Sequence, residues 1–189
     1  MKEKIEKYIK ESISVKQELL KSQADTLSQM AKMLIHCIRS DGKILIFGNG
    51  GSAADSQHMA AELVGRFKKE RQPIAAIALS TNTSTLTALA NDYGYGATFK
   101  RQLEALGRRG DAAIGISTSG NSENVYEALL SARKIGLKII TMTGKDGGKI
   151  SGMADVALKV PSDDTPHIQE SHITAAHIVC GLIEDELFG

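Results

Sequence analysis

The sequence predicts an α/β fold, in which a doubly wound, five-stranded parallel sheet is flanked by helices and preceded by an N-terminal helical extension. One observation is that short apolar runs alternate with segments of about a dozen residues that have helical spacing of apolar side chains. Such alternation is typical of βαβ crossovers, which give a parallel sheet covered on both faces. The other observation is that two Gly/Ser-rich loops each follow an apolar run, which places them at the carboxyl ends of strands, where ligands bind.

Length and composition indicate a single domain over residues 1–189, with 42% hydrophobic and 24% charged residues. Lys and Arg number 23 against 22 acidic residues, so the chain lacks the excess of positive charge that is typical of proteins that bind nucleic acid or an anionic membrane. The first ten residues mix charges with apolar side chains, unlike a signal peptide, and no apolar run approaches membrane-spanning length. We therefore expect a cytoplasmic protein with no nucleic-acid or membrane partner. Cys37 and Cys180 lie in apolar helical patterns and are expected to be buried thiols.

The N-terminal segment, residues 1–39, is predicted to be helical because its apolar residues recur at intervals near three and four. The spacing loosens near Ser22–Asp25, so we predict two pieces, with Ser22 or Asp25 as the cap of the second. Amphipathic helices need an apolar partner, which predicts that this segment takes part in oligomerisation. Residues 40–189 are then the α/β core.

Strands and helices follow in order through the core. A buried strand covers 44–47, and its helix runs to about Glu70. The apolar and helical patterns then predict strands at 73–79, 111–116, 138–143 and 156–160, and helices at 84–91, 98–106, through 125–132, and at 167–187. The start of the last helix is predicted from Asp163 and Asp164, which are typical cap residues, and from Pro166, which is favoured at the first helical position.

The first loop, Gly48–Ser52, resembles an anion cradle, because glycines allow tight turns and the following helix points its N–H groups at the loop. The spacing Gly48-x-Gly50-x-x-Ala53 is close to a dinucleotide fingerprint, but the second strand ends in Ser80–Asn82 without the acidic residue such a site needs. A nucleotide P-loop is excluded because no Gly-Lys-Ser/Thr follows. A purely structural turn stays open as an alternative.

The second loop, Ser117–Ser122, offers four hydroxyls, on Ser117, Thr118, Ser119 and Ser122. Hydroxyls and backbone N–H groups at a helix N-terminus can bind a phosphate without Lys or Arg. The alternative is an ordinary turn in which a serine caps the helix. Two such loops on one sheet edge favour a phosphorylated small molecule as ligand.

His58 and Glu62 are spaced i, i+4, so their side chains project from one helix face about 6 Å apart along the axis. They could share a metal ion or form an acid/base pair, or simply be a solvated pair on an exposed face. Gln169 and His177 are separated by about 12 Å along a continuous helix and about 80° around it. Either the first turn is distorted, or the two residues act at sites assembled from different subunits.

Several runs together, GNGGSAADSQHMAAELVGRF, ANDYG, GISTSGNS, PSDDTPHIQESHI and AAHIVC, resemble the phosphoheptose isomerase family of the sugar isomerase (SIS) domain superfamily over essentially the whole chain. The resemblance implies a cytoplasmic homotetramer with active sites between subunits. It also implies conversion of sedoheptulose 7-phosphate into D-glycero-D-manno-heptose 7-phosphate. This is the first step toward ADP-heptose or GDP-heptose for lipopolysaccharide or other glycans.

Site residues are carried over from the family by position. The substrate contacts fall on Asn49, Gly50, Gly51, Glu62, Asn91, Asp92, Ser117, Thr118, Ser119, Ser122 and Gln169. The resemblance implies zinc as cofactor, one ion per subunit, with His58, Glu62, Gln169 and His177 as ligands. It also implies that Glu62 and His177 are the catalytic acid/base pair. The two implied roles conflict, because a group held tightly by zinc is poorly placed to transfer a proton.

Two alternatives belong to the same superfamily. A non-catalytic tetramer, the DnaA initiator-associating protein, lacks the Glu and His that stand here at Glu62 and His177. The other is an SIS isomerase or etherase acting on a different phosphosugar, such as an aminosugar phosphate.

Overall fold

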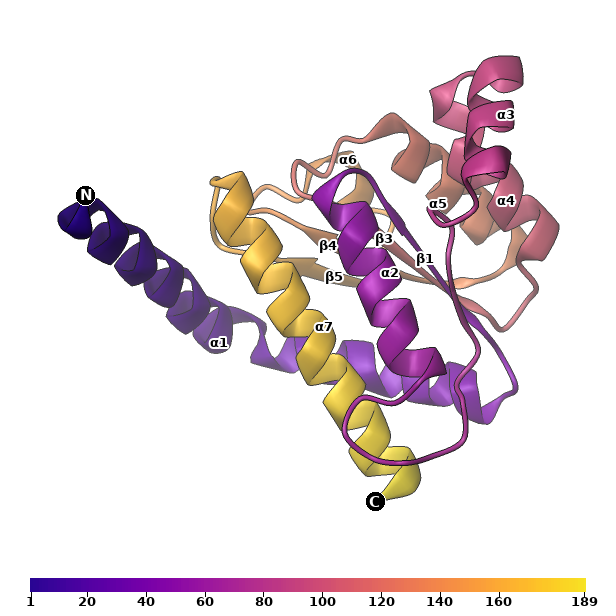
Figure 1. Ribbon diagram of the computed structural model, residues 1–189. Helices are drawn as coiled ribbons and strands as arrows, with labels where there is room; N and C mark the ends of the chain where they lie inside the picture. The colour runs from indigo at the N-terminus through magenta and orange to yellow at the C-terminus, as the bar shows by residue number, and fades with distance from the viewer.

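The computed structural model describes residues 1–189 and contains one five-stranded parallel sheet with strand order β2-β1-β3-β4-β5 (Figure 1). The strands are β1 (Ile44–Gly48), β2 (Ala76–Ala78), β3 (Ala112–Ser117), β4 (Lys138–Thr143) and β5 (Val156–Lys159). In the register of the sheet, Ile46 of β1 lies between Ala78 of β2 and Ile114 of β3. The predicted fold class is therefore confirmed.

Helices cover both faces of the sheet. One face is covered by α1 (Lys2–Arg39), α2 (Gly51–Val64) and α7 (Thr165–Phe188), which pack on the larger core cluster. The other side carries α3 (Thr83–Tyr93), a 3-10 turn at Tyr95–Ala97, α4 (Thr98–Leu106), α5 (Glu123–Ile135) and α6 (Gly148–Ser151). Strand β1 is buried along its whole length, with Ile44 and Ile46 in one core cluster and Leu45 and Phe47 in the other.

The prediction of two N-terminal helical pieces was wrong, because α1 is one continuous helix through residues 22–25. Ser22 does not cap a second helix; its hydroxyl donates to the Glu18 carbonyl one turn back, at 2.7 Å. Serine tolerates this arrangement inside a helix when an acceptor lies at i−4. The first turns of α1 extend beyond the rest of the molecule, while the second half packs under α7 and the sheet (Figure 1).

The helix after the first strand is shorter than predicted, ending at Val64 instead of about Glu70. Gly65 lies at its C-cap, and the chain then forms a loop whose backbone N–H groups bind Glu184 of α7. Strand β2 starts only at Ala76, although the sequence predicted it from Pro73. Pro73 has no N–H to donate to a sheet ladder, and the Ile74 N–H donates at 3.1 Å to the Leu63 carbonyl at the end of α2 instead of to a strand.

Both cysteines are buried and free, as predicted. Burial raises the pKa of Cys37 to about 11 and that of Cys180 to about 12. None of the helices combines the length and the apolar character that a bilayer crossing requires.

Candidate active site

The first loop turns at Gly50, which has φ 55° and ψ −120° and therefore needs glycine. Gly51 begins α2, and a Cβ on it would collide with the side-chain amide of Gln169 from α7. No side chain caps α2; instead the Ser52 N–H donates to the Asn49 carbonyl and the Ala53 N–H to the Gly50 carbonyl, both at 3.0 Å. The first loop is thus closed by its own backbone hydrogen bonds, with the Gln169 amide directly beside it.

The side chain of Asn49 is held by a reciprocal amide pair with Asn124 of α5. The Asn49 amide nitrogen donates to the Asn124 oxygen at 2.8 Å, and the Asn124 nitrogen donates back at 2.9 Å. The Tyr95 hydroxyl donates to the same Asn49 oxygen at 3.0 Å. These bonds join the first loop to α5 and to the 3-10 turn, and they fix the orientation of the Asn49 amide.

The serine hydroxyls of the second loop contact one another. Ser117 Oγ lies 2.9 Å from Ser122 Oγ and 3.5 Å from Ser119 Oγ. Ser122 stands at the N-cap of α5, as the alternative of a serine cap expected, but its side chain makes no capping hydrogen bond. Thr118 and Ser119 also line a polar pocket of about 310 Å³ whose other wall includes Lys145 and Asp163. The hydroxyls therefore form a compact group of donors beside an open pocket.

The third group is the cluster of His58, Glu62 and His177, whose ligand atoms all lie within 4.8 Å of one another. The Nε2 atoms of the two imidazoles are 2.8 Å apart, and Glu62 Oε1 lies 3.2 Å from His58 Nε2. Phe67 stacks on the His177 ring at 5.6 Å between centroids. Two imidazole nitrogens and a carboxylate oxygen converging on one point are a donor set that suits Zn²⁺, with one position left for water or substrate.

Comparisons with known proteins agree with one another. The family model of the SIS domain matches residues 7–144. The chain is 51% identical to the phosphoheptose isomerase of Sulfurimonas denitrificans over 100% of this chain and 98% of that one, and 53% identical to that of Helicobacter pylori over 95% and 96%. This chain belongs to the phosphoheptose isomerase family. The solved phosphoheptose isomerase GmhA of Neisseria gonorrhoeae has a TM-score of 0.93 at 47% identity and covers 97% of this chain and 98% of its own.

Within this chain, the predicted site residues fall into separate groups. His58, Glu62 and His177 come together, whereas Gln169 lies at the first loop. Positions 58 and 62 lie roughly 10–16 Å along α2 from its start at Gly51. One chain thus separates the first loop from the acid/base candidates.

Asn91 and Asp92 lie at the end of α3 and are exposed. The Asn91 amide donates to the Asp92 carboxylate at 2.8 Å, so the pair holds its own orientation. No hydrogen bond or ion pair joins them to the cluster or to either loop in the same chain. Their exposed side chains are free to meet a ligand or a second copy of the chain.

Sequence reasoning missed Asn124, Tyr95 and Asp55. Asp55 stands one turn before His58, and burial raises its pKa to about 6 while the charge of His58 acts in the opposite direction. Its Oδ2 atom is buried without a hydrogen-bond partner. The helical spacing from His58 could have indicated Asp55, but no sequence signal pairs Asn124 with a residue 75 positions away.

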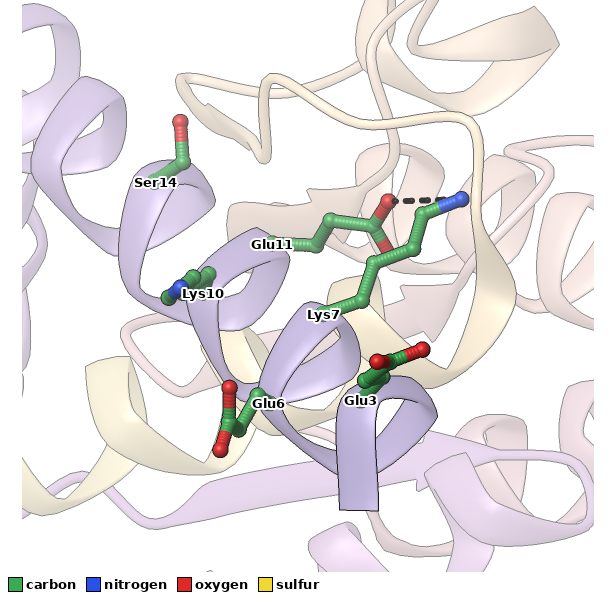
Figure 2. A pocket seen from close by; sticks show the side chains of 6 residues that line it. All are labelled: Glu3, Glu6, Lys7, Lys10, Glu11 and Ser14. Carbon is green, nitrogen blue, oxygen red and sulfur yellow. Dashed lines mark ion pairs between the residues drawn. The ribbon is translucent and has the colours of Figure 1, made fainter. Parts of the chain in front are cut away.

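One hollow lies away from all these groups, along the first turns of α1 (Figure 2). It is lined by Glu3, Glu6, Lys7, Lys10, Glu11 and Ser14, without any hydrophobic side chain. Lys7 and Glu11 form an exposed ion pair across 3.7 Å. This is a solvated groove between charged side chains of one helix, and none of the family's site positions lies in it.

Proposed function

We propose that this chain is an aldose–ketose isomerase that converts sedoheptulose 7-phosphate into D-glycero-D-manno-heptose 7-phosphate. The observation that carries the proposal is the meeting of Glu62 with His58 and His177 in a chain about half identical to phosphoheptose isomerases along its whole length. The reaction moves a proton between C1 and C2 through an enediol. It needs a base at carbon and an acid at oxygen, and the cluster offers both types of group.

The phosphate is assigned to the second loop, where Ser117, Thr118, Ser119 and Ser122 would donate hydroxyl and backbone hydrogen bonds at the start of α5. Asn49, Gly50 and Gly51 would bind the sugar from the first loop. Asn91, Asp92, Glu62 and Gln169 would complete the substrate contacts. The grouping of the serine hydroxyls and the position of the Gln169 amide beside Gly51 support this assignment.

Glu62 is assigned as the base that takes the carbon proton, and His177 as the acid that serves a substrate oxygen. The carboxylate oxygen can accept a proton, and a protonated imidazole nitrogen can donate one. Phe67 on one face of the His177 ring limits the directions from which a substrate oxygen can approach. The remote phosphate contacts would hold the reacting carbons in place.

Zinc is the proposed cofactor, held by His58, Glu62 and His177, with Gln169 as the fourth ligand. Bound zinc would stabilise negative charge on the enediolate oxygens. The convergence of three ligand atoms supports the first three residues. Gln169 lies at the first loop of its own chain, so its role as a ligand to this ion needs another copy of the chain.

We propose a homotetramer with active sites between subunits. Two observations support it. The loop group and the cluster are separated within one chain, and Ile5, Ile9 and Ile13 expose half or more of their surface along the protruding part of α1. We also place the enzyme in the cytoplasm, at the start of heptose supply for lipopolysaccharide or other glycans.

The test is turnover of sedoheptulose 7-phosphate compared with fructose 6-phosphate and glucosamine 6-phosphate. The expected result is a clear preference for the seven-carbon substrate in kcat/KM. Preference for either six-carbon phosphate would assign the chain to another SIS isomerase. No turnover of any of them by zinc-loaded protein would contradict an isomerase function.

A further inference from the structure

A buried ion pair connects the two helices that carry the cluster. Arg71, in the loop after α2, and Glu184 of α7 pair at 3.0 Å between Nε and Oε1. Their side chains are 1% and 2% exposed. No sequence motif marked either residue, and neither belongs to the substrate, metal or acid/base positions described above.

Arg71 holds the end of α2 at the residue that carries the carboxylate. Its Nη2 donates to the backbone carbonyl of Glu62 at 2.7 Å, and Nη1 donates to the carbonyl of Leu63 at 2.8 Å. These carbonyls belong to the last turn of α2, where helical partners are missing. The guanidinium therefore sets where the last turn of α2, and with it Glu62, lies relative to α7.

Glu184 acts on the other side of the cluster. Its Oε1 accepts the Phe67 N–H at 2.8 Å, and its Oε2 accepts the N–H groups of Lys68 and Lys69 at 2.8 and 3.1 Å. Burial alone would raise the pKa of Glu184, but the N–H donors together with Arg71 lower it, which keeps the carboxylate charged. Glu184 thereby fixes the backbone of Phe67.

Phe67 connects Glu184 to His177, because its backbone is bound by Glu184 and its ring packs on the His177 ring. Glu184 follows His177 by seven residues, two helical turns, so both side chains project from the same face of α7. The Phe67 ring stacks on His177 with an interplanar angle of 27°. Gly181 lies between the two turns, and a Cβ there would already touch the Phe67 ring at 3.5 Å.

We propose that Arg71 and Glu184 are positioning residues for the His58–Glu62–His177 cluster, and that Phe67 transmits their effect to His177. The proposal depends on the proposed function only for its effect on turnover. Its effect on metal affinity does not depend on which sugar phosphate is the substrate. Partners that orient metal ligands from outside the coordination sphere typically change metal affinity about 10- to 100-fold when altered.

The experiment titrates metal-free protein with Co²⁺, whose visible spectrum reports both affinity and coordination geometry, and measures kcat and KM separately. The variants are Glu184→Gln and Arg71→Lys, of which the lysine cannot reach two carbonyls and Glu184 together. We expect Co²⁺ affinity to fall about 10-fold or more, with an altered spectrum. We expect kcat to fall with KM nearly unchanged, because neither residue belongs to the loop group.

Asp111→Asn is the matched control. Asp111 is also buried, pairs with Lys43 and accepts backbone N–H groups from Lys43 and Arg108, but at the start of the sheet strands. This variant should lose stability without losing Co²⁺ affinity. Wild-type Co²⁺ affinity and kcat in folded Glu184→Gln would overturn the proposal, as would equal Co²⁺ loss in Asp111→Asn.

If the charge-pair variants fail to fold, Phe67 supplies the test. Phe67→Tyr keeps the ring on His177 and should bind Co²⁺ like wild type, whereas Phe67→Leu should bind more weakly. Equal affinities for the two Phe67 variants would refute the proposed transmission. The two proposals can fail separately. If the variants bind Co²⁺ more weakly than wild type but wild type turns over no sugar phosphate, the positioning role is supported and the proposed function is rejected.

Discussion

His58 and His177 are separated by 119 positions in the sequence, yet their Nε2 atoms lie 2.8 Å apart. They meet because α2 and α7 lie side by side over the same face of the sheet (Figure 1). Glu62, one turn after His58, adds its carboxylate oxygen at 3.2 Å. All three side chains retain some exposure, so changing them should affect chemistry more than folding.

Glu62→Gln should abolish most isomerase activity while metal content and assembly remain. Glutamine keeps the shape and one oxygen of the side chain but cannot accept the carbon proton. Loss of a general base typically costs about 10²–10⁴-fold in rate. Exchange of the C1 or C2 hydrogen with deuterated buffer should also stop, which NMR can follow.

The matched control for this change is Glu127→Gln, a half-buried carboxylate that pairs with Lys100 at 3.3 Å on the far side of the sheet. It should retain normal turnover. Wild-type exchange in Glu62→Gln would make Glu62 a ligand or a bystander. Asp92 would then be the next candidate for the base.

Replacing Ser117 and Ser119 together with alanine should weaken substrate binding and raise KM. A hydrogen bond to a charged group contributes about 1.5–3 kcal/mol, so two losses should raise KM more than tenfold. Ser131→Ala is the control, because this buried hydroxyl donates to Glu104 at 2.8 Å away from both loops. An unchanged KM in the double variant would show that the phosphate is bound elsewhere.

Asn124→Ala should both destabilise the protein and raise KM. It removes the partner of the Asn49 amide in a buried position, and an unpaired buried polar group costs about 1–3 kcal/mol of unfolding free energy. Urea unfolding gives the first effect and steady-state kinetics the second. By contrast, Asn91→Ala should raise KM with little change in unfolding, because Asn91 is exposed and pairs only with its neighbour.

His172 should contribute a pH-dependent part of the stability. Burial lowers the pKa of His172 to about 4, against the hydrogen bond from its Nε2 to the Thr143 carbonyl. Because the folded-state pKa lies below the unfolded value of about 6.5, the unfolded state binds the proton more readily. Its stabilising contribution is complete above pH 6.5 and is lost as pH falls toward 4.

His172→Gln should therefore have a Tm that changes less than that of wild type between pH 6.5 and 4. Thermal unfolding followed by circular dichroism at several pH values measures the difference. The glutamine amide can still donate to Thr143, so the change removes titration more than packing. Parallel Tm curves for the two proteins would contradict the shifted pKa.

Light scattering should give a particle of four chains at micromolar concentration. The substitutions Ile9→Lys and Ile13→Lys place charges on the exposed apolar face of α1 and should yield smaller species with reduced activity. A monomeric wild type with full turnover would reject both the tetramer and the site shared between subunits.

Much of the fold followed from local patterns. The bounds of α4 and β4 match the apolar periodicity that predicted them, because both elements are amphipathic or buried throughout. The end of α2 was missed because the charged residues after Gly65 are compatible with a helix. The backbone N–H groups of Phe67, Lys68 and Lys69 instead donate to the carboxylate of Glu184, a residue of the last helix.

The site was only partly predictable for the same reason. Helical spacing placed His58 beside Glu62, since that relation is local. The approach of His177 to His58, and that of Asn124 to Asn49, depends on how distant elements pack. No single-sequence pattern contains that information, and family resemblance supplied the residue types but not which of them meet within one chain.

The position of α7 has a consequence for synthesis. A nascent chain that has reached Lys159 already contains every strand together with α1 and α2, but it lacks α7, which packs on both of these helices and carries His177. The larger core cluster would then lack Ile168, Val179 and Ile183, and the apolar side chains of α1 and α2 that pack on α7 would face solvent or a chaperone. The last helix therefore closes the apolar face and completes the cluster in the same event, so a ribosome product truncated before it would be both inactive and prone to aggregate.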